Sequence, residues 1–114
     1  MSRAGVVFVH GQPAGVLREE SAEGQALAYV FTYDANYLAQ ANAQPISLTM
    51  PLRREPYRQD HLHPFFVSLL AEGALAEIQC RLLRIDERDL FGRVLVTCRD
   101  TIGAVTVDRL EPTP

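Results

Sequence analysis

The stretch 45–75 constrains the fold most, because its hydrophobic pattern changes period partway along. Residues 46–50 alternate apolar and polar side chains, which predicts a half-buried β-strand. In that strand Ile46, Leu48 and Met50 face one way, and the serine and threonine between them face the other. The region therefore begins as part of a sheet.

A proline-containing loop and a helix follow the predicted strand. Pro51 and Pro56 exclude a continuous helix and remove backbone donors, so residues 53–63 are expected to form a polar, exposed loop. Beyond the loop, apolar side chains recur at helical spacing, which predicts a helix over 64–71 that Gly73 can end. The chain thus passes from a β-rich half to a helical half.

The N-terminal half carries further alternating segments. They predict three strands, of which the first two form a hairpin across the Gly- and Pro-rich turn 11–15: residues 5–10, 16–17 and 27–33. Asp34 is expected to cap a short helix over 35–41 by accepting hydrogen bonds from its free N–H groups.

The C-terminal half predicts two more helices and a closing strand. A helix over 74–83 is expected to keep its charged residues outside and to turn its large apolar side inward: Leu75, Ile78, Leu82 and Leu83. Asp86 is expected to cap the next helix, whose apolar stripe is Leu90, Phe91, Val94 and Leu95. Gly92 should weaken that helix by about 1 kcal/mol relative to alanine. The turn 99–103 then leads into a strand over 104–107.

These elements predict an α+β fold: a small, mostly antiparallel sheet with three to four helices packed on it. With 114 residues, the chain is expected to form a single domain over 1–114. A net charge of −3 argues against a direct nucleic-acid surface, and no apolar run approaches the roughly 20 residues that span a membrane. Cys80 and Cys98 are too far apart for a C-x-x-C pair, which favours reduced, packed cysteines in a cytoplasmic protein.

The chain carries little sign of catalytic chemistry. It has no phosphate-binding G-x-x-x-x-G-K-[ST] or G-x-G-x-x-G and no G-x-S-x-G nucleophile motif. His61 and His63, beside Asp60, are the best pair of metal ligands, yet a zinc site needs a third or fourth ligand that the sequence does not supply. We therefore expect no enzyme activity, metal or cofactor; a metal-dependent enzyme using the two histidines is the weakest hypothesis.

The predicted loop 53–63 is the best candidate for a binding surface. It and the helix start that follows combine arginines with aromatic and histidine side chains, types that supply contact area and hydrogen-bond donors at protein interfaces. The candidate partner-binding residues are Arg53, Arg54, Tyr57, Arg58, His61, His63 and Phe65. A loop that is merely solvated is the alternative.

Several motifs together resemble a known family. They are PISLTMPL at 45–52, PFFVSLLAEG at 64–73 and RDTIGAVTV at 99–107, with a supporting FTYDANYL at 31–38. In this order they resemble the N-terminal subdomain of HipA-type toxin kinases, and the resemblance covers nearly the whole chain. Two positions depart from the family pattern: Ala71 stands where a proline is usual, and Cys98 where a glycine is usual.

The resemblance implies a function that the residues alone do not. HipA-type proteins continue into a kinase core, whereas this sequence ends at Pro114. We therefore expect a stand-alone, HipS-like antitoxin of a tripartite HipBST-type system, which binds a HipT- or HipA-like serine/threonine kinase in trans, beside a HipB-like DNA-binding protein. The alternative is an assembly module of a kinase–HipB–DNA complex that neutralises nothing. The resemblance implies inhibition by an aromatic side chain placed near the kinase site, a role that Tyr57, His63 or Phe65 would take here.

Overall fold

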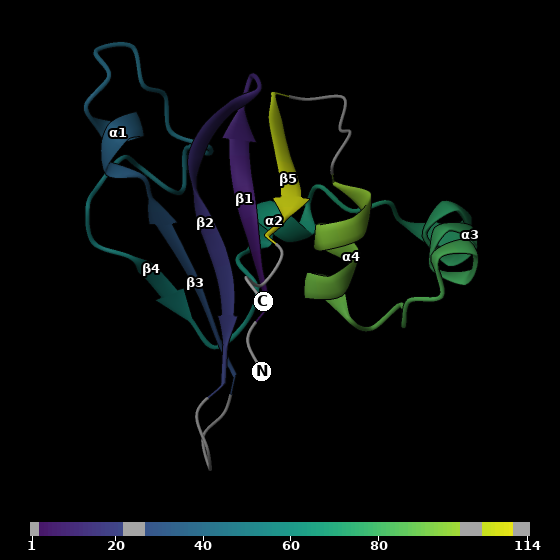
Figure 1. The fold of residues 1–114 in the computed structure, drawn as a ribbon. Helices are drawn as coiled ribbons and strands as arrows, with labels where there is room; N and C mark the ends of the chain where they lie inside the picture. The colour runs from purple at the N-terminus through teal and green to yellow at the C-terminus, as the bar shows by residue number, and fades with distance from the viewer. Residues whose placement is uncertain (1–2, 22–26, 99–103, 111–114) are drawn as a thin grey trace.

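The computed structural model describes residues 3–21, 27–98 and 104–110. Within them a five-stranded antiparallel sheet, in the order β4-β3-β2-β1-β5, packs against helices (Figure 1). The α+β prediction is confirmed. The elements are β1 Arg3–Val9, β2 Gln12–Glu20, β3 Ala28–Tyr33, α1 Ala35–Leu38, β4 Tyr57–Gln59, α2 Pro64–Val67, α3 Gly73–Leu83, α4 Leu90–Thr97 and β5 Val105–Arg109.

The predicted N-terminal hairpin forms, with a longer second strand than the alternation indicated. Strands β1 and β2 pair antiparallel through a turn at His10 and Gly11, both of which have positive φ, 49° and 79°. Strand β2 continues to Glu20 although its end is polar, because Glu19 is buried in an ion pair with Arg3. The polar end of β2, which looks exposed in the sequence, therefore contributes a buried carboxylate to a polar contact.

One face of the sheet carries the core. Alternate residues of the strands meet apolar side chains of α2, α4 and the segment between α1 and β4. The largest fully buried side chains of this cluster are Phe31, Phe66, Phe91, Leu17, Met50, Val7, Val94 and Val107. Helix α4 lies close enough to β1 that a Cβ on Gly5 would sit 2.7 Å from Leu95 Cδ2, so only glycine fits there. The core thus fixes α4 against the sheet.

The predicted strand over 46–50 is wrong: the segment is a turn closed by an isolated bridge between Ser47 and Met50. Local hydrogen bonds replace a ladder, because the Ser47 side chain accepts from Thr49 N at 3.2 Å and Met50 N donates to the carbonyl of Ser47 at 3.0 Å. Tyr33 holds both ends of the turn: its hydroxyl accepts from Ile46 N and donates to the carbonyl of Met50. Ile46 and Met50 are buried, but Leu48 is 95% exposed at the tip.

Three boundaries also differ from prediction. The segment 53–63 is not loop throughout, because β4 pairs with β3 inside it. Helix α2 ends at Val67 instead of residue 71, and Gly73, with φ +61°, begins α3 instead of ending α2. Helix α1 stops at Leu38 instead of residue 41, and Asp34 occupies its N-cap position without a side-chain hydrogen bond. Beyond α2 the apolar spacing continues, but Leu69 N and Leu70 N bond to the carbonyls three residues back, so the chain there forms tighter turns and not α-helix.

The helix predicted after Asp86 begins later and is capped by another residue. Asp89 is the N-cap of α4, and its side chain accepts from Gly92 N at 3.2 Å. Asp86 instead accepts from the backbone N–H and the guanidinium of Arg88. The predicted closing strand is confirmed as β5, whereas the predicted turn 99–103 lies outside the described residues.

The two cysteines are free and buried, as predicted. None of the helices in the described residues combines the length and hydrophobicity of a membrane span.

Candidate functional site

The sequence-predicted binding residues begin with two that contact each other. Arg53 stacks on Tyr57, with its guanidinium carbon 3.6 Å from the ring centroid, and donates to the carbonyls of Glu55 and Pro56. Tyr57 is half-buried in β4, where its ring meets Tyr33 edge-on and its hydroxyl donates to the carbonyl of Pro51. This pair folds the loop back on itself. A partner could therefore contact only the outer surface of the Arg53–Tyr57 pair.

The other charged candidates differ in how freely they can meet a partner. Arg58 forms an ion pair with Glu20 at 3.0 Å, and His61 Nδ1 lies 2.8 Å from Asp60 Oδ1. Both contacts are exposed and cost little to exchange for a partner group. Arg54 is exposed and makes no hydrogen bond or ion pair within the described part of the chain. Of the arginines in this loop, Arg54 is the most available.

His63 and Phe65 have local structural roles. His63 Nδ1 accepts a hydrogen bond from Phe65 N at 3.0 Å, so the imidazole caps the first turn of α2. Burial, followed by the charge of His61, lowers the pKa of His63 below its ordinary 6.5, which keeps the ring neutral and able to accept. Phe65 is half-buried against Phe66. Within the described residues no group of three or more histidine, cysteine or acidic side chains is placed to hold a metal ion.

A second surface, on α3, was not foreseen from the sequence. Prediction placed its large apolar residues on the inner side, but the structure exposes Leu75, Ile78 and Leu82 by 57%, 52% and 77%. The side chains that α3 buries are small: Ala76 and Cys80. The amphipathic stripe is real, and it points outward. The sequence does carry a signal for this: Ala76 and Cys80, four positions apart, form a second apolar side of the helix, made of small residues.

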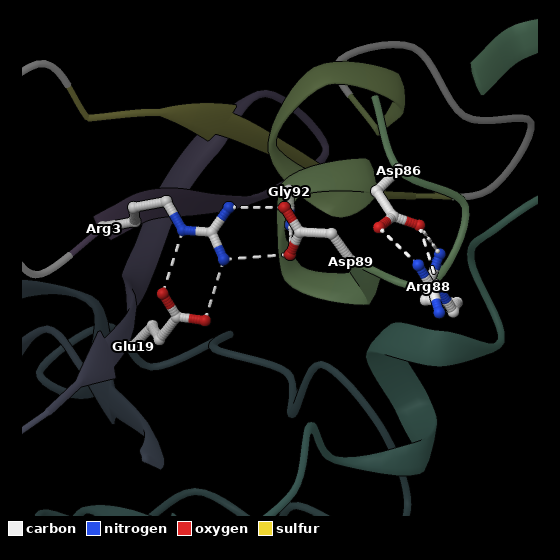
Figure 2. A network of polar contacts seen from close by, with 6 residues as sticks. All are labelled: Arg3, Glu19, Asp86, Arg88, Asp89 and Gly92. Atoms are coloured by element: carbon white, nitrogen blue, oxygen red, sulfur yellow. Dashed lines mark hydrogen bonds and ion pairs between the residues drawn. The ribbon is translucent and has the colours of Figure 1, made fainter. Parts of the chain in front are cut away.

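A polar network that the sequence did not reveal fixes α4 to the sheet (Figure 2). The Arg3 guanidinium donates two hydrogen bonds to Glu19, at 2.8 and 2.9 Å, and two to Asp89, at 2.8 and 2.9 Å. Its hydrogen bonds lower the pKa of Asp89, and both carboxylates raise the pKa of Arg3. The network joins residues 86 positions apart, so no local pattern announces it. We call these three residues, Arg3, Glu19 and Asp89, the clamp, because they hold the start of α4 against the sheet.

Gly92 is part of the same network. A Cβ at this position would lie 2.3 Å from Asp89 Oδ2 and 2.9 Å from Arg3 Nη1. The glycine that looked like a weakness of the helix therefore makes room for the carboxylate and guanidinium.

The comparisons with known proteins agree with one another. A family model described as "HipA N-terminal domain" matches residues 6–108. An uncharacterised protein of Haemophilus influenzae is 34% identical over 105 residues, covering 92% of this chain and 91% of that protein. Among solved structures, the "N-terminal domain of HipA toxin" superposes with a TM-score of 0.68 at 32% identity, covering 97% of this chain and 95% of that one. The chain therefore belongs to the HipA N-terminal domain family.

Proposed function

We propose that this protein is a non-catalytic antitoxin that binds a HipT- or HipA-like serine/threonine kinase in trans and neutralises it. The observations that carry the proposal are the family match over residues 6–108 and a relative that is itself matched over 91% of its length. The matched solved structure is the N-terminal domain of a toxin. The Haemophilus influenzae relative, matched over 91% of its length, supports a domain of this family acting as a separate chain.

The environment of the histidines favours binding over catalysis. His63 Nδ1 accepts a hydrogen bond from the α2 backbone, and His61 contacts the exposed carboxylate of Asp60. Both histidines thus have local structural explanations that require no reaction.

The candidate partner-binding residues remain part of the proposal. Arg54 offers a free guanidinium, whereas Arg53 and Tyr57 give the loop a stiff shape. With a net charge of −3, contact with DNA would run through a HipB-like partner.

Co-expression with a HipT- or HipA-like kinase chain, taken from the neighbouring gene where that gene encodes one, tests the proposal. We expect rescue of growth and a complex that co-purifies. A complex without rescue would instead support the assembly module, and no complex would contradict both functions. Arg54→Glu should weaken the complex if the loop contacts the kinase, while Arg18→Glu, at another exposed arginine, on β2, serves as its matched control.

A further inference from the structure

We propose that α3 is a docking helix: its outer stripe, Leu75, Ile78 and Leu82, inserts into an apolar groove on the kinase chain. The inference rests on the proposed function and deepens it, because it names the surface that holds the partner. It assigns this role to a helix that the sequence motifs did not single out.

The stripe is defined by helix geometry. At about 100° per residue, Leu75, Ile78 and Leu82 fall on one line along α3, at i, i+3 and i+7. Ala76 and Cys80, the buried residues, lie roughly 150° around the helix from that line. Helix α3 is therefore apolar on two sides. Helices with this pattern usually have both sides packed against other structure. Within the described part of the chain, the side with Ala76 and Cys80 is covered and the stripe is exposed.

The position of α3 makes the stripe accessible. Figure 1 shows α3 at the edge of the molecule, with α4 between it and the sheet. Beyond the stripe, Leu83 adds a side chain that is 49% exposed on the same helix. Such a concentration of large apolar side chains on one helix differs from singly scattered exposed residues, which need no explanation.

The size and shape of the stripe favour a groove over a second copy of this chain. A stable interface uses about 20–30 residues on each side, and three stripe residues on an 11-residue helix fall short when two convex helices meet. A concave partner encloses the helix on several sides and reaches the neighbouring surface as well. This is the helix-in-groove mode, in which anchors at i, i+3 and i+7 fill successive pockets.

The charges beside the stripe describe the groove's rim. Glu77 and Arg81 form an exposed i,i+4 ion pair, with 3.7 Å between the charged atoms, along one border of the stripe. The facing rim should therefore carry polar groups of both signs, with the apolar contacts at its centre.

The test measures, by titration calorimetry, the affinity of variants of this 114-residue chain for the separately purified kinase chain. Ile78→Arg combined with Leu82→Arg should weaken binding by about 100-fold or more, because both anchors become charged. Leu48→Arg makes the same chemical change at a residue that is 95% exposed in the 47–50 turn, and it should bind like wild type. Thermal unfolding of each variant checks that the fold is retained.

Each outcome decides something different. If the α3 variant binds the kinase as tightly as wild type does, the docking-helix proposal is wrong and the antitoxin proposal still stands. A loss caused by Arg54→Glu but not by the α3 variant would move the contact to the loop. No binding by wild type would overturn the proposed function itself. Sedimentation of the chain alone should show a monomer; a dimer abolished by the α3 variant would make a second copy the occupant instead.

Discussion

Helices α3 and α4 carry similar stripes of large apolar residues, and the structure treats them oppositely. In α4, Phe91, Val94 and Leu95 are 1%, 0% and 2% exposed. In α3 the corresponding residues are more than half exposed, and the helix is held by small side chains. Hydrophobic periodicity thus shows which residues share a helix face. It does not show whether that face meets the chain's own core or something else.

The difference arises from what surrounds each helix. Helix α4 is fixed at its start by Asp89, which Arg3 ties to Glu19 on β2, and at its end by Val107 N, which donates to the carbonyl of Cys98 at 2.8 Å. Helix α3 has no side-chain hydrogen bond at its N-cap, and it ends with Arg84 in the left-handed conformation. One helix is locked to the sheet, and the other presents a surface.

The same substitution in both helices should separate these roles most clearly. Leu95→Ala removes a side chain packed on Gly5 and should lower the free energy of unfolding by about 3 kcal/mol. Leu82→Ala should change it by less than about 0.5 kcal/mol, because Leu82 already faces solvent. Urea denaturation of both variants measures the difference. Equal losses would mean that α3 is part of the core in solution.

The clamp beneath α4 gives the next largest effect. Arg3→Met leaves the Glu19 carboxylate, whose side chain is 8% exposed, without its partner. We expect a loss of about 2 kcal/mol, less than for a fully buried pair because Arg3 itself is 32% exposed.

Arg88→Met is the matched control for the clamp. Figure 2 shows Arg88 paired with Asp86 beside the clamp, but this pair lies in solvent, with the Arg88 side chain 91% exposed. Its urea midpoint should match wild type. A control that destabilises as much as Arg3→Met would show that burial of Glu19 is not what makes the clamp matter.

Gly92→Ala tests the packing within the clamp by the sign of its effect. In an ordinary helix the change would stabilise by about 1 kcal/mol, but here the new methyl group meets the Asp89 carboxylate. We expect a net loss of about 1 kcal/mol.

The background Asp89→Ala removes that obstacle. In it, the additional Gly92→Ala change should become neutral or stabilising, and a double-mutant cycle from thermal unfolding measures the coupling. If Gly92→Ala lowers stability equally in both backgrounds, the new methyl group clashes with a group other than the Asp89 carboxylate.

Elements with a strong period were predictable from the sequence, as the hairpin, β3, α4 and β5 show. The turn at 46–50 was not, because hydrogen bonds from Ser47 and from the distant Tyr33 override its alternation. The clamp was invisible for a related reason: Arg3, Glu19 and Asp89 meet only once the sheet and α4 have formed.

The candidate site shows the same limit. Composition identified an arginine- and aromatic-rich loop, but not that Arg53 would stack on Tyr57 or that His63 would cap α2. The outward direction of the α3 stripe depends on how Ala76 and Cys80 seat the helix, which is a property of the packed molecule.

The smallest predicted effect is the pH dependence of the clamp. Arg3 lowers the pKa of Asp89 below its ordinary 3.8, so the folded protein keeps this carboxylate charged at acidity that protonates it in the unfolded chain. Its contribution to stability is therefore complete above about pH 3.8 and is lost as the pH falls through the lower, folded value.

Asp89→Asn keeps a capping side chain but cannot titrate. The stability difference between wild type and this variant should be under about 1 kcal/mol at pH 6, because Asp89 is 37% exposed and screened by solvent. It should shrink between pH 4 and pH 2.5 in a series of urea unfolding curves. Leu82→Ala, on the unlocked helix, should differ from wild type by the same amount at every pH. A wild-type advantage over Asp89→Asn that persists at low pH would mean that the clamp acts through shape instead of charge, and the contrast between the two helices would then rest on packing alone.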